Sequence, residues 1–378
     1  MIHWQWKHPV SVLFETGGLV AFLKTLTHER IAIITTPGFK KRGLIDQIRM
    51  EIDEKLVAIV DTVETNPSIR QVSEMGGRLR AFKPDCLLAV GGGSAMDSAK
   101  AVARILGEPK HWSLEKHLTE GYPTTSKSNL KIIAIPTTSG TGSEVTSFGT
   151  IWNHEENKKF SVTGDDLYPE IAFLDPKLTS TLPKEITISC ALDSISHALE
   201  STWNINANSM TFALSTQSLQ LSLRNLVPLL ENPQDLELRA RIMEASLFAG
   251  YSISHTRTAL AHSISYPLTT KFSLPHGFAC SFTLPALLDY NAKVDDGRLS
   301  HLSKSVGFES IESLKLELLS IFKKVNLKTY FEKYVSGYDQ IKEIEELMIT
   351  PERADHNLRG FSSRDISNLL EESFSSML

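Results

Sequence analysis

The hydrophobic positions divide the chain into two halves with different periodicities. In the first half, short and nearly continuous apolar runs predict strands within residues 30–36, 55–63, 85–94 and 130–144, the last two running into turns of small residues. Between them, residues 66–82 and 95–106 carry apolar side chains at helical spacing. Continuous apolar strands that alternate with helices are typical of a parallel sheet covered on both faces. We therefore expect an α/β, Rossmann-like domain.

The second half has helical periodicity almost throughout. Residues 218–232, 237–254 and 314–327 are each predicted as helices, and β-branched runs are scarce. The pair Leu182-Pro183 separates the two patterns. We expect an α/β domain over residues 1–183 and an all-α domain over residues 184–378.

Composition narrows the class of protein. The 378 residues are 41% hydrophobic and 22% charged, with a net charge of −5, as in soluble globular proteins. The absence of a basic surplus argues against nucleic-acid binding. The N-terminus does not resemble a signal peptide, and no window approaches the roughly 18 apolar residues of a spanning helix. Three cysteines, Cys86, Cys190 and Cys280, show no disulfide or zinc-finger spacing, so we expect a protein of the reducing cytoplasm without a membrane partner.

Four residues in the helical half have the chemistry of metal ligands. Asp193 and His197 are four residues apart, which places both on one face of a helix, and His262 and His276 follow. One carboxylate and three imidazoles suit a divalent first-row metal such as Fe²⁺, Zn²⁺ or Mn²⁺. The alternative is that these are packed or surface side chains, with Asp193 and His197 a simple hydrogen-bonded pair.

Two turns of small residues in the first half suggest phosphate binding. The segment GGGSAMDSAK (91–100) follows a strand and opens a helix, so the backbone amides of Gly92, Gly93 and Ser94 lie at the positive end of a helix dipole. The segment PTTSGTGSE (136–144) also follows a strand. Two such loops at strand ends mark the crevice where doubly wound sheets bind nucleotides. A flexible turn and a helix cap are the plainer alternatives.

These motifs, taken in order, resemble the iron-containing (group III) alcohol dehydrogenases over about residues 9–290. The resemblance implies a nucleotide-binding domain, a helical metal-binding domain, and subunits that assemble as dimers or larger. It places Asp193, His197, His262 and His276 at the metal-ligand positions, with Fe²⁺ as the expected ion and Zn²⁺ as the second candidate. It further implies that the dinucleotide contacts a set of small, polar and basic residues: Gly92, Gly93, Ser94, Asp97, Thr137, Thr138, Thr141 and Lys159.

Two positions depart from the family pattern. Where many members carry a second histidine four residues after the third ligand, this chain has Tyr266, which is a weaker base near neutral pH.

Where members that prefer NAD carry an acidic residue, this chain has Thr36, Pro37 and Gly38, followed by Lys40, Lys41 and Arg42. No carboxylate in that segment repels a 2′-phosphate, so we expect NADP(H) to be preferred over NAD(H). The alternative is that these cations form a solvated helix start.

The residues before His262 suggest the substrate. His255 and Arg257 occupy a segment where most members acting on simple alcohols have small or apolar residues, and guanidinium pairs well with phosphonate or carboxylate. The segment also resembles the branch that reduces phosphonoacetaldehyde to 2-hydroxyethylphosphonate. The alternative is that His255 and Arg257 serve a structural salt bridge and that the substrate is neutral, such as lactaldehyde, 1,3-propanediol or butanol. Remoter still is a lyase of the dehydroquinate synthase type, which recycles its cofactor.

Overall fold

The computed structural model describes residues 4–156 and 158–377, and they form two compact units. One unit comprises residues 7–138 and 143–180, and the other comprises residues 4–6, 139–142 and 181–377. Residues Ser139–Gly142 belong to the helical unit, so the division differs from a single domain boundary at residue 183. It also puts Thr141 in a different unit from Thr137 and Thr138.

The first unit is a six-stranded parallel sheet with the order β1-β8-β5-β4-β2-β3. The strands are β1 (Ser11–Phe14), β2 (Ile31–Thr35), β3 (Leu56–Val60), β4 (Cys86–Gly91), β5 (Lys131–Pro136) and β8 (Ile171–Leu174). A separate antiparallel hairpin consists of β6 (Phe148–Asn153) and β7 (Lys158–Thr163). The α/β prediction is confirmed, although β1, β8 and the hairpin were not predicted.

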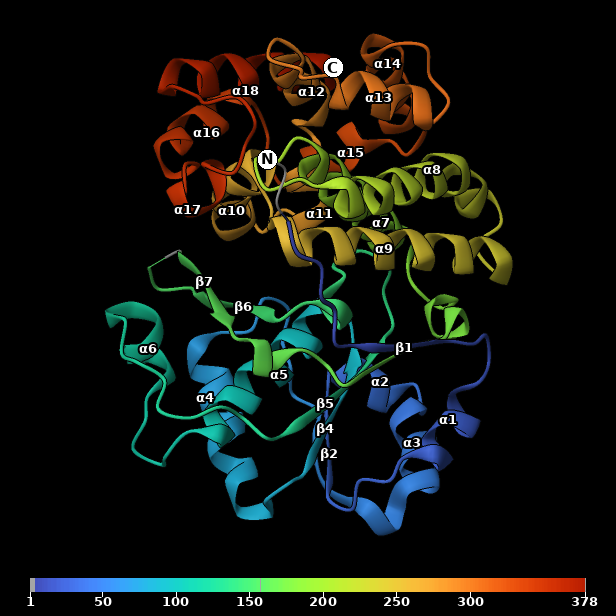
Figure 1. Cartoon of the computed structure of the whole chain (residues 1–378), viewed down its shortest axis with the longest axis vertical. Helices are drawn as coiled ribbons and strands as arrows, with labels where there is room; N and C mark the ends of the chain where they lie inside the picture. Colours follow the sequence, from blue (N-terminus) through green and yellow to red (C-terminus); the bar gives the residue numbers. More distant parts are fainter. Residues whose placement is uncertain (1–3, 157, 378) are drawn as a thin grey trace. The chain divides into compact units, whose positions relative to one another are not determined.

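Helices cover both faces of this sheet (Figure 1). On one side lie α1 (Leu19–Thr25), α2 (Pro37–Lys41) and α3 (Leu44–Ile52), and on the other α4 (Ile69–Leu79), α5 (Gly93–Gly107) and α6 (Leu114–Glu120). Successive residues of β2 alternate between the two cores: Ile31 and Ile33 join one, whereas Ala32 and Ile34 join the other. Because both faces are buried, the strand is apolar at every position rather than at every second one.

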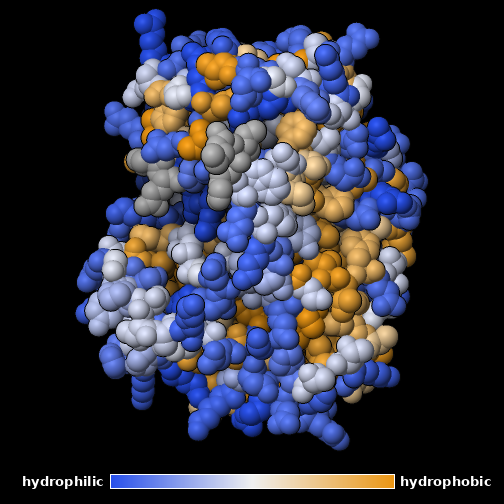
Figure 2. Space-filling model, in the orientation of Figure 1, coloured by the Kyte–Doolittle hydropathy of each residue, from blue (hydrophilic) through white to orange (hydrophobic). Residues whose placement is uncertain are grey.

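The edge strand β1 is the exception to this burial. Leu13 is 43% exposed and Phe14 is 37% exposed, and hydrophobic side chains gather over this strand in Figure 2. One edge of the sheet therefore presents unpaired backbone groups together with apolar side chains.

The second unit contains helices α7 to α18 around a single apolar core. The helices are α7 (Lys184–Thr202), α8 (Ser209–Glu231), α9 (Leu236–Thr256), α10 (Leu260–Phe272), α11 (His276–Ser281), α12 (Leu284–Ala292), α13 (Arg298–Ser305), α14 (Ile311–Lys324), α15 (Leu327–Glu332), α16 (Tyr338–Glu343), α17 (Pro351–Ala354) and α18 (Ser363–Met377). Its helical character is as predicted. Among the described residues, no helix combines the length and apolarity needed to cross a membrane.

The start of α8 illustrates how the local sequence sets these helices. The Asn208 side chain accepts from the amides of Met210 and Thr211, while the Thr211 hydroxyl accepts from the Asn208 amide. This reciprocal capping box satisfies backbone donors that the first turn leaves unpaired. The helix then packs along α9, and both pack against α7, which becomes the central helix of the unit.

Candidate metal centre and nucleotide loops

The central helix α7 carries three functional side chains on one face. Asp193, His197 and Glu200 are spaced by four and three residues, and each is at most 5% exposed. Polar groups buried to this extent require partners, because an unpaired buried charge is strongly unfavourable. The burial of α7 therefore forces these side chains to satisfy one another and their neighbours.

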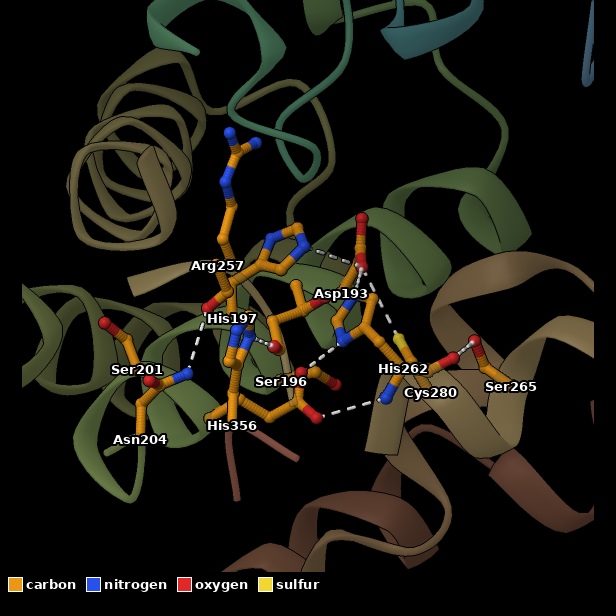
Figure 3. Close-up of polar contacts among 12 residues, drawn as sticks. Asp193, Ser196, His197, Ser201, Asn204, Arg257, His262, Ser265, Cys280 and His356 are labelled. Atoms are coloured by element: carbon orange, nitrogen blue, oxygen red, sulfur yellow. Dashed lines mark hydrogen bonds and ion pairs between the residues drawn. The ribbon is translucent and has the colours of Figure 1, made fainter. Parts of the chain in front are cut away.

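The partners arrive from α10 and α11, which pack against α7. The Asp193 Oδ1 atom lies 3.5 Å from Nε2 of His197, 3.3 Å from Nε2 of His262 and 4.0 Å from Nε2 of His276. Figure 3 shows side chains from the three helices converging on this carboxylate. All four predicted metal-ligand residues are thus brought to one place within the helical unit.

Charge and burial act in opposite directions within this cluster. Burial favours a neutral Asp193, but the three imidazoles hold the pKa of its carboxyl well below the usual range. Burial lowers the pKa of His197 to about 4. Burial also acts to lower the pKa of His262, but the negative charges of Glu200 and Asp193 outweigh burial and raise the pKa of that imidazole to about 10.

The donor set fits a divalent cation. Nε2 of His262 is buried and lacks a hydrogen-bond partner, although it faces the Asp193 carboxylate at 3.3 Å. Donor atoms of Asp193, His262, His276 and Cys280 all lie within 4.8 Å of one another, and His197 reaches the same carboxylate. An orphaned imidazole nitrogen beside an ionised carboxylate is the arrangement that a bound metal completes.

Sequence reasoning missed two members of this cluster. Cys280 donates its S–H to Asp193 Oδ1 at 3.4 Å, and it follows His276 by four residues on α11. Glu200 follows His197 by three residues on α7 and bonds to His262. Glu200 could have been found by extending the helical-spacing argument from Asp193 and His197 to the next turn, whereas the position of Cys280 depends on the packing of α11 on α7.

The predicted nucleotide loops begin side by side in the α/β unit, although Ser139–Gly142 of the second loop belong to the helical unit. Gly91 of β4 pairs with Pro136 of β5, so the turns after both strands leave the same edge of the sheet. Gly91 has φ +156°, and a Cβ at Gly92 would stand 2.9 Å from the Thr138 hydroxyl oxygen. Glycine is therefore required where the turn packs against the next loop, and the backbone of Gly92 and Gly93 is left free of side-chain bulk.

Asp97 has an internal role in addition to the predicted contact with the dinucleotide. One oxygen accepts from the Ser143 hydroxyl at 2.6 Å and the other from the Thr150 amide at 2.8 Å. Burial raises the pKa of this carboxyl, whereas Lys100 and Lys159 act to lower it. Asp97 therefore ties the N-terminal part of α5 to the loop after β5 and to the hairpin, near the predicted residue Lys159. The Ser94 hydroxyl oxygen, also in that turn, accepts from the Asn66 amide at 3.3 Å.

The end of β2 requires a correction. Thr36 caps α2 at the end of this strand, and Lys40 follows, as expected. However, the Lys40 ammonium forms a 2.7 Å ion pair with Asp61, which comes directly after the neighbouring strand β3. The segment itself holds no carboxylate, but the sheet brings Asp61 beside it from the end of the neighbouring strand, so the NADP(H) preference stays a prediction.

Tyr266, His255 and Arg257 have different surroundings. The Tyr266 ring centroid lies 6.4 Å from that of His276, beside the metal cluster. His255 stacks on Trp6 with centroids 3.8 Å apart, and its Nδ1 pairs with the Ser254 hydroxyl. Arg257 ends α9 with φ 65° and ψ −180°, and Figure 3 shows its side chain directed away from Asn204.

Comparison with known proteins identifies the family. Residues 9–176 match the iron-containing alcohol dehydrogenase family model, and residues 187–374 match the model of the family's C-terminal domain. The chain belongs to the iron-containing alcohol dehydrogenase family of oxidoreductases. It spans about a third of the length of the aldehyde-alcohol dehydrogenases that it also matches.

Three other relatives are matched over more of their own length. The 1-propanol dehydrogenase PduQ of Salmonella typhimurium is 31% identical over 300 residues, covering 78% of this chain and 76% of the relative. Phosphonoacetaldehyde reductase of Streptomyces viridochromogenes is 32% identical over 275 residues, covering 71% and 68%. The crystal structure of sulfoacetaldehyde reductase from Bifidobacterium kashiwanohense with NAD⁺ has a TM-score of 0.90 at 25% identity, covering 99% of this chain and 100% of that one.

Proposed function

We propose that the protein is a metal-dependent, NAD(P)H-linked alcohol dehydrogenase that works as an aldehyde reductase. The observation that carries this proposal is the buried cluster around Asp193, with the unpartnered Nε2 of His262 aimed into it. The proposed ligands are Asp193, His197, His262 and His276, with Fe²⁺ as the first candidate ion and Zn²⁺ as the second.

The residues would divide the reaction between them. A divalent ion held by these donors would polarise the aldehyde oxygen as a Lewis acid, and NAD(P)H would supply the hydride. Asp193 provides the negative charge that retains the cation, and the burial of α7 excludes water from that side. The Tyr266 ring lies beside that of His276, and we assign its hydroxyl the role of giving a proton to the product oxygen.

For the substrate, we propose a short anionic aldehyde, with phosphonoacetaldehyde as the first candidate. Two relatives support this choice, because the name of one contains phosphonoacetaldehyde and that of the other sulfoacetaldehyde. Both aldehydes carry a tetrahedral anion two carbons from the reacting oxygen. A guanidinium is well suited to such an anion, so Arg257 is the candidate recognition residue.

The backbone of Arg257 supports a functional role. Its φ of 65° and ψ of −180° fall in a region that is almost restricted to glycine and costs about 1–3 kcal/mol for other residues. Two side chains hold the residue there: Asn204 Nδ2 and the Thr256 hydroxyl both donate to the Arg257 carbonyl, at 3.3 and 2.9 Å. A strained arginine that is held so firmly is costly for stability, which favours a role in binding.

The test measures NADPH oxidation by metal-loaded protein with phosphonoacetaldehyde, butyraldehyde and lactaldehyde. We expect phosphonoacetaldehyde to have the highest kcat/KM. Arg257→Gly should reduce that value by about 10- to 100-fold, the worth of a charged hydrogen bond, while sparing the neutral aldehydes. The same variant should be more stable to urea by about 1 kcal/mol, because glycine relieves the strain.

Arg241 offers a matched control on the same helix. Arg241 is exposed and pairs with Glu237 and Glu244. Arg241→Ala should therefore leave the preference among the three aldehydes unchanged and should not relieve backbone strain. If Arg257→Gly affects charged and neutral aldehydes alike, Arg257 is structural. The substrate would then be a neutral short-chain aldehyde or alcohol, a candidate favoured by the similarity to 1-propanol dehydrogenase.

Three finer points complete the proposal. NADP(H) is proposed as the preferred dinucleotide because Lys40 lies at the end of β2, although Asp61 competes for its charge. His255, held against Trp6, is proposed to support Arg257. Free cysteines suit a cytoplasmic protein, and the apolar edge strand β1 suits a homodimer or larger assembly.

A further inference from the structure

The cluster contains a buried carboxylate that is not among the proposed ligands. Glu200 is fully buried, and its Oε1 accepts the backbone amide of His262 at 3.1 Å. Its Oε2 pairs with Nδ1 of the same imidazole. One side chain thus holds both the main chain and the ring of His262, at the start of α10.

The chemistry of these acceptors determines the tautomer of the ring. An ionised carboxylate only accepts hydrogen bonds, so Nδ1 of His262 must carry the proton. In a neutral imidazole, Nε2 then bears the lone pair, and this is the atom that faces Asp193 without a hydrogen-bond partner. His197 is oriented in the same way, since its Nδ1 donates to the carbonyl oxygen of Gly140 at 3.2 Å.

The two imidazoles differ in the charge of their supporting group. Gly140 offers a neutral carbonyl, whereas Glu200 offers a full negative charge in a region that excludes water. When His262 is neutral, as a bound cation requires, Asp193 and Glu200 give the cluster a charge of −2, which a divalent cation neutralises. A carboxylate on the outer nitrogen also makes an imidazole a stronger donor.

We propose that Glu200 is a positioning residue that fixes the orientation and tautomer of His262 and thereby sets the affinity of the cluster for a divalent cation. The proposal rests on the metal site proposed above. It assigns Glu200 no contact with the substrate or the dinucleotide.

The experiment measures Zn²⁺ affinity of the full-length, metal-stripped protein by competition with a chromophoric chelator. Glu200→Gln keeps the shape of the side chain and removes its charge. We expect its Zn²⁺ affinity to fall by about 10- to 100-fold, the usual effect of losing such a partner. In the His262→Ala background, the same substitution should have no further effect, because Glu200 acts through that ring.

Ser201→Ala is the matched control. Ser201 is also fully buried on α7, but its hydroxyl pairs with Thr256 and not with the cluster. It should lower the stability of the metal-free protein and leave Zn²⁺ affinity unchanged. If Glu200→Gln does not fold, Glu200→Asp replaces it. This variant keeps the negative charge but has a side chain one methylene shorter, so its carboxylate should no longer reach His262, and the same loss of Zn²⁺ affinity is expected.

The outcomes separate the two proposals. Wild-type protein that fails to bind Zn²⁺ or Fe²⁺ would refute the metal site itself. Wild-type protein that binds, together with a Glu200 variant within twofold of it, would refute the role of Glu200. An equal loss in the wild-type and His262→Ala backgrounds would also refute it, because the effect would not pass through His262.

Discussion

Two buried glutamates, one in each unit, have opposite ionisation behaviour. Glu144, in the short helix η3 (Ser143–Val145) of the α/β unit, is 3% exposed, and burial raises the pKa of its carboxyl to about 7. Glu200, on α7 of the helical unit, is 0% exposed, yet His262 holds the pKa of its carboxyl below the usual value. At neutral pH the same side chain at the same depth is therefore partly protonated in one place and ionised in the other.

The difference lies in the partners. Within the described part of the chain, Glu144 is stabilised as an anion by its own backbone amide and by a longer-range attraction from Lys100, whose ammonium is bonded to Ser143, Thr146 and Phe148. Glu200 has two hydrogen bonds from His262. The comparison indicates that a buried carboxyl keeps its charge where a neighbouring group donates hydrogen bonds to it, as His262 does for Glu200 beside the proposed metal ligands.

The largest effect is expected when that charge cluster is broken. His262→Ala or Asp193→Ala should weaken metal binding strongly and reduce aldehyde reduction by about 10³-fold or more, since Lewis-acid activation contributes several kcal/mol. Dinucleotide affinity should survive, because the glycine turns belong to the other unit. Metal analysis and fluorescence titration with NADPH test both statements, and retained activity in either variant would overturn the site.

Packing around the cluster gives the next largest effect. A Cβ added at Gly277 would stand 1.7 Å from the Ser189 carbonyl oxygen of α7, so Gly277→Ala should separate α11 from α7. We expect a loss of about 3 kcal/mol in the free energy of unfolding, measured by urea denaturation. Gly77→Ala on α4 is the control, because nothing lies within 4 Å of its added Cβ, and it should be neutral or slightly stabilising.

The comparison between the glutamates can itself be tested by pH. Because the folded pKa of Glu144 lies above its ordinary value of 4.5, its contribution to stability is full below about pH 4.5 and is lost as pH rises to about 7. A shift of this size corresponds to about 3 kcal/mol at most. Glu144→Gln should remove this decline, so its stability relative to wild type should increase between pH 4.5 and 8. A constant difference across that range would contradict the assignment.

Cofactor choice should show the smallest effect. Asp61→Asn releases Lys40 from its ion pair and should increase the NADPH-to-NADH ratio of kcat/KM by a few-fold, since exposed ion pairs contribute about 1 kcal/mol or less. Lys40→Ala should decrease the ratio by a similar factor. If both variants keep the wild-type NADPH-to-NADH ratio of kcat/KM, the residues after β2 do not bind the 2′-phosphate.

The sequence predicted the features that depend on periodicity and residue type. The interior strands were predictable because β2 and β4 are apolar at nearly every position, as parallel strands buried on both faces must be. The convergence of Asp193, His197, His262 and His276 followed from chemically distinctive side chains. The edge strand β1 was missed because its four residues are mostly exposed.

Features that depend on tertiary contacts were not predictable. Asp61 reaches Lys40 only because β3 lies beside β2 in the sheet. Cys280 was treated as one of three isolated cysteines, since nothing in its segment shows that α11 packs on α7. The strain at Arg257 arises from Asn204, which is 53 residues away in the chain. Such contacts join segments whose proximity only the fold determines.

The most direct test of the metal-dependent reductase is an anaerobic titration of metal-stripped protein with Fe²⁺, following NADPH oxidation by phosphonoacetaldehyde. We predict that the stripped protein is inactive and that activity rises linearly to a plateau at one ion per chain. Each aldehyde reduced should consume one NADPH. Full activity in the presence of excess chelator, or turnover without net NADPH consumption, would contradict the proposed function.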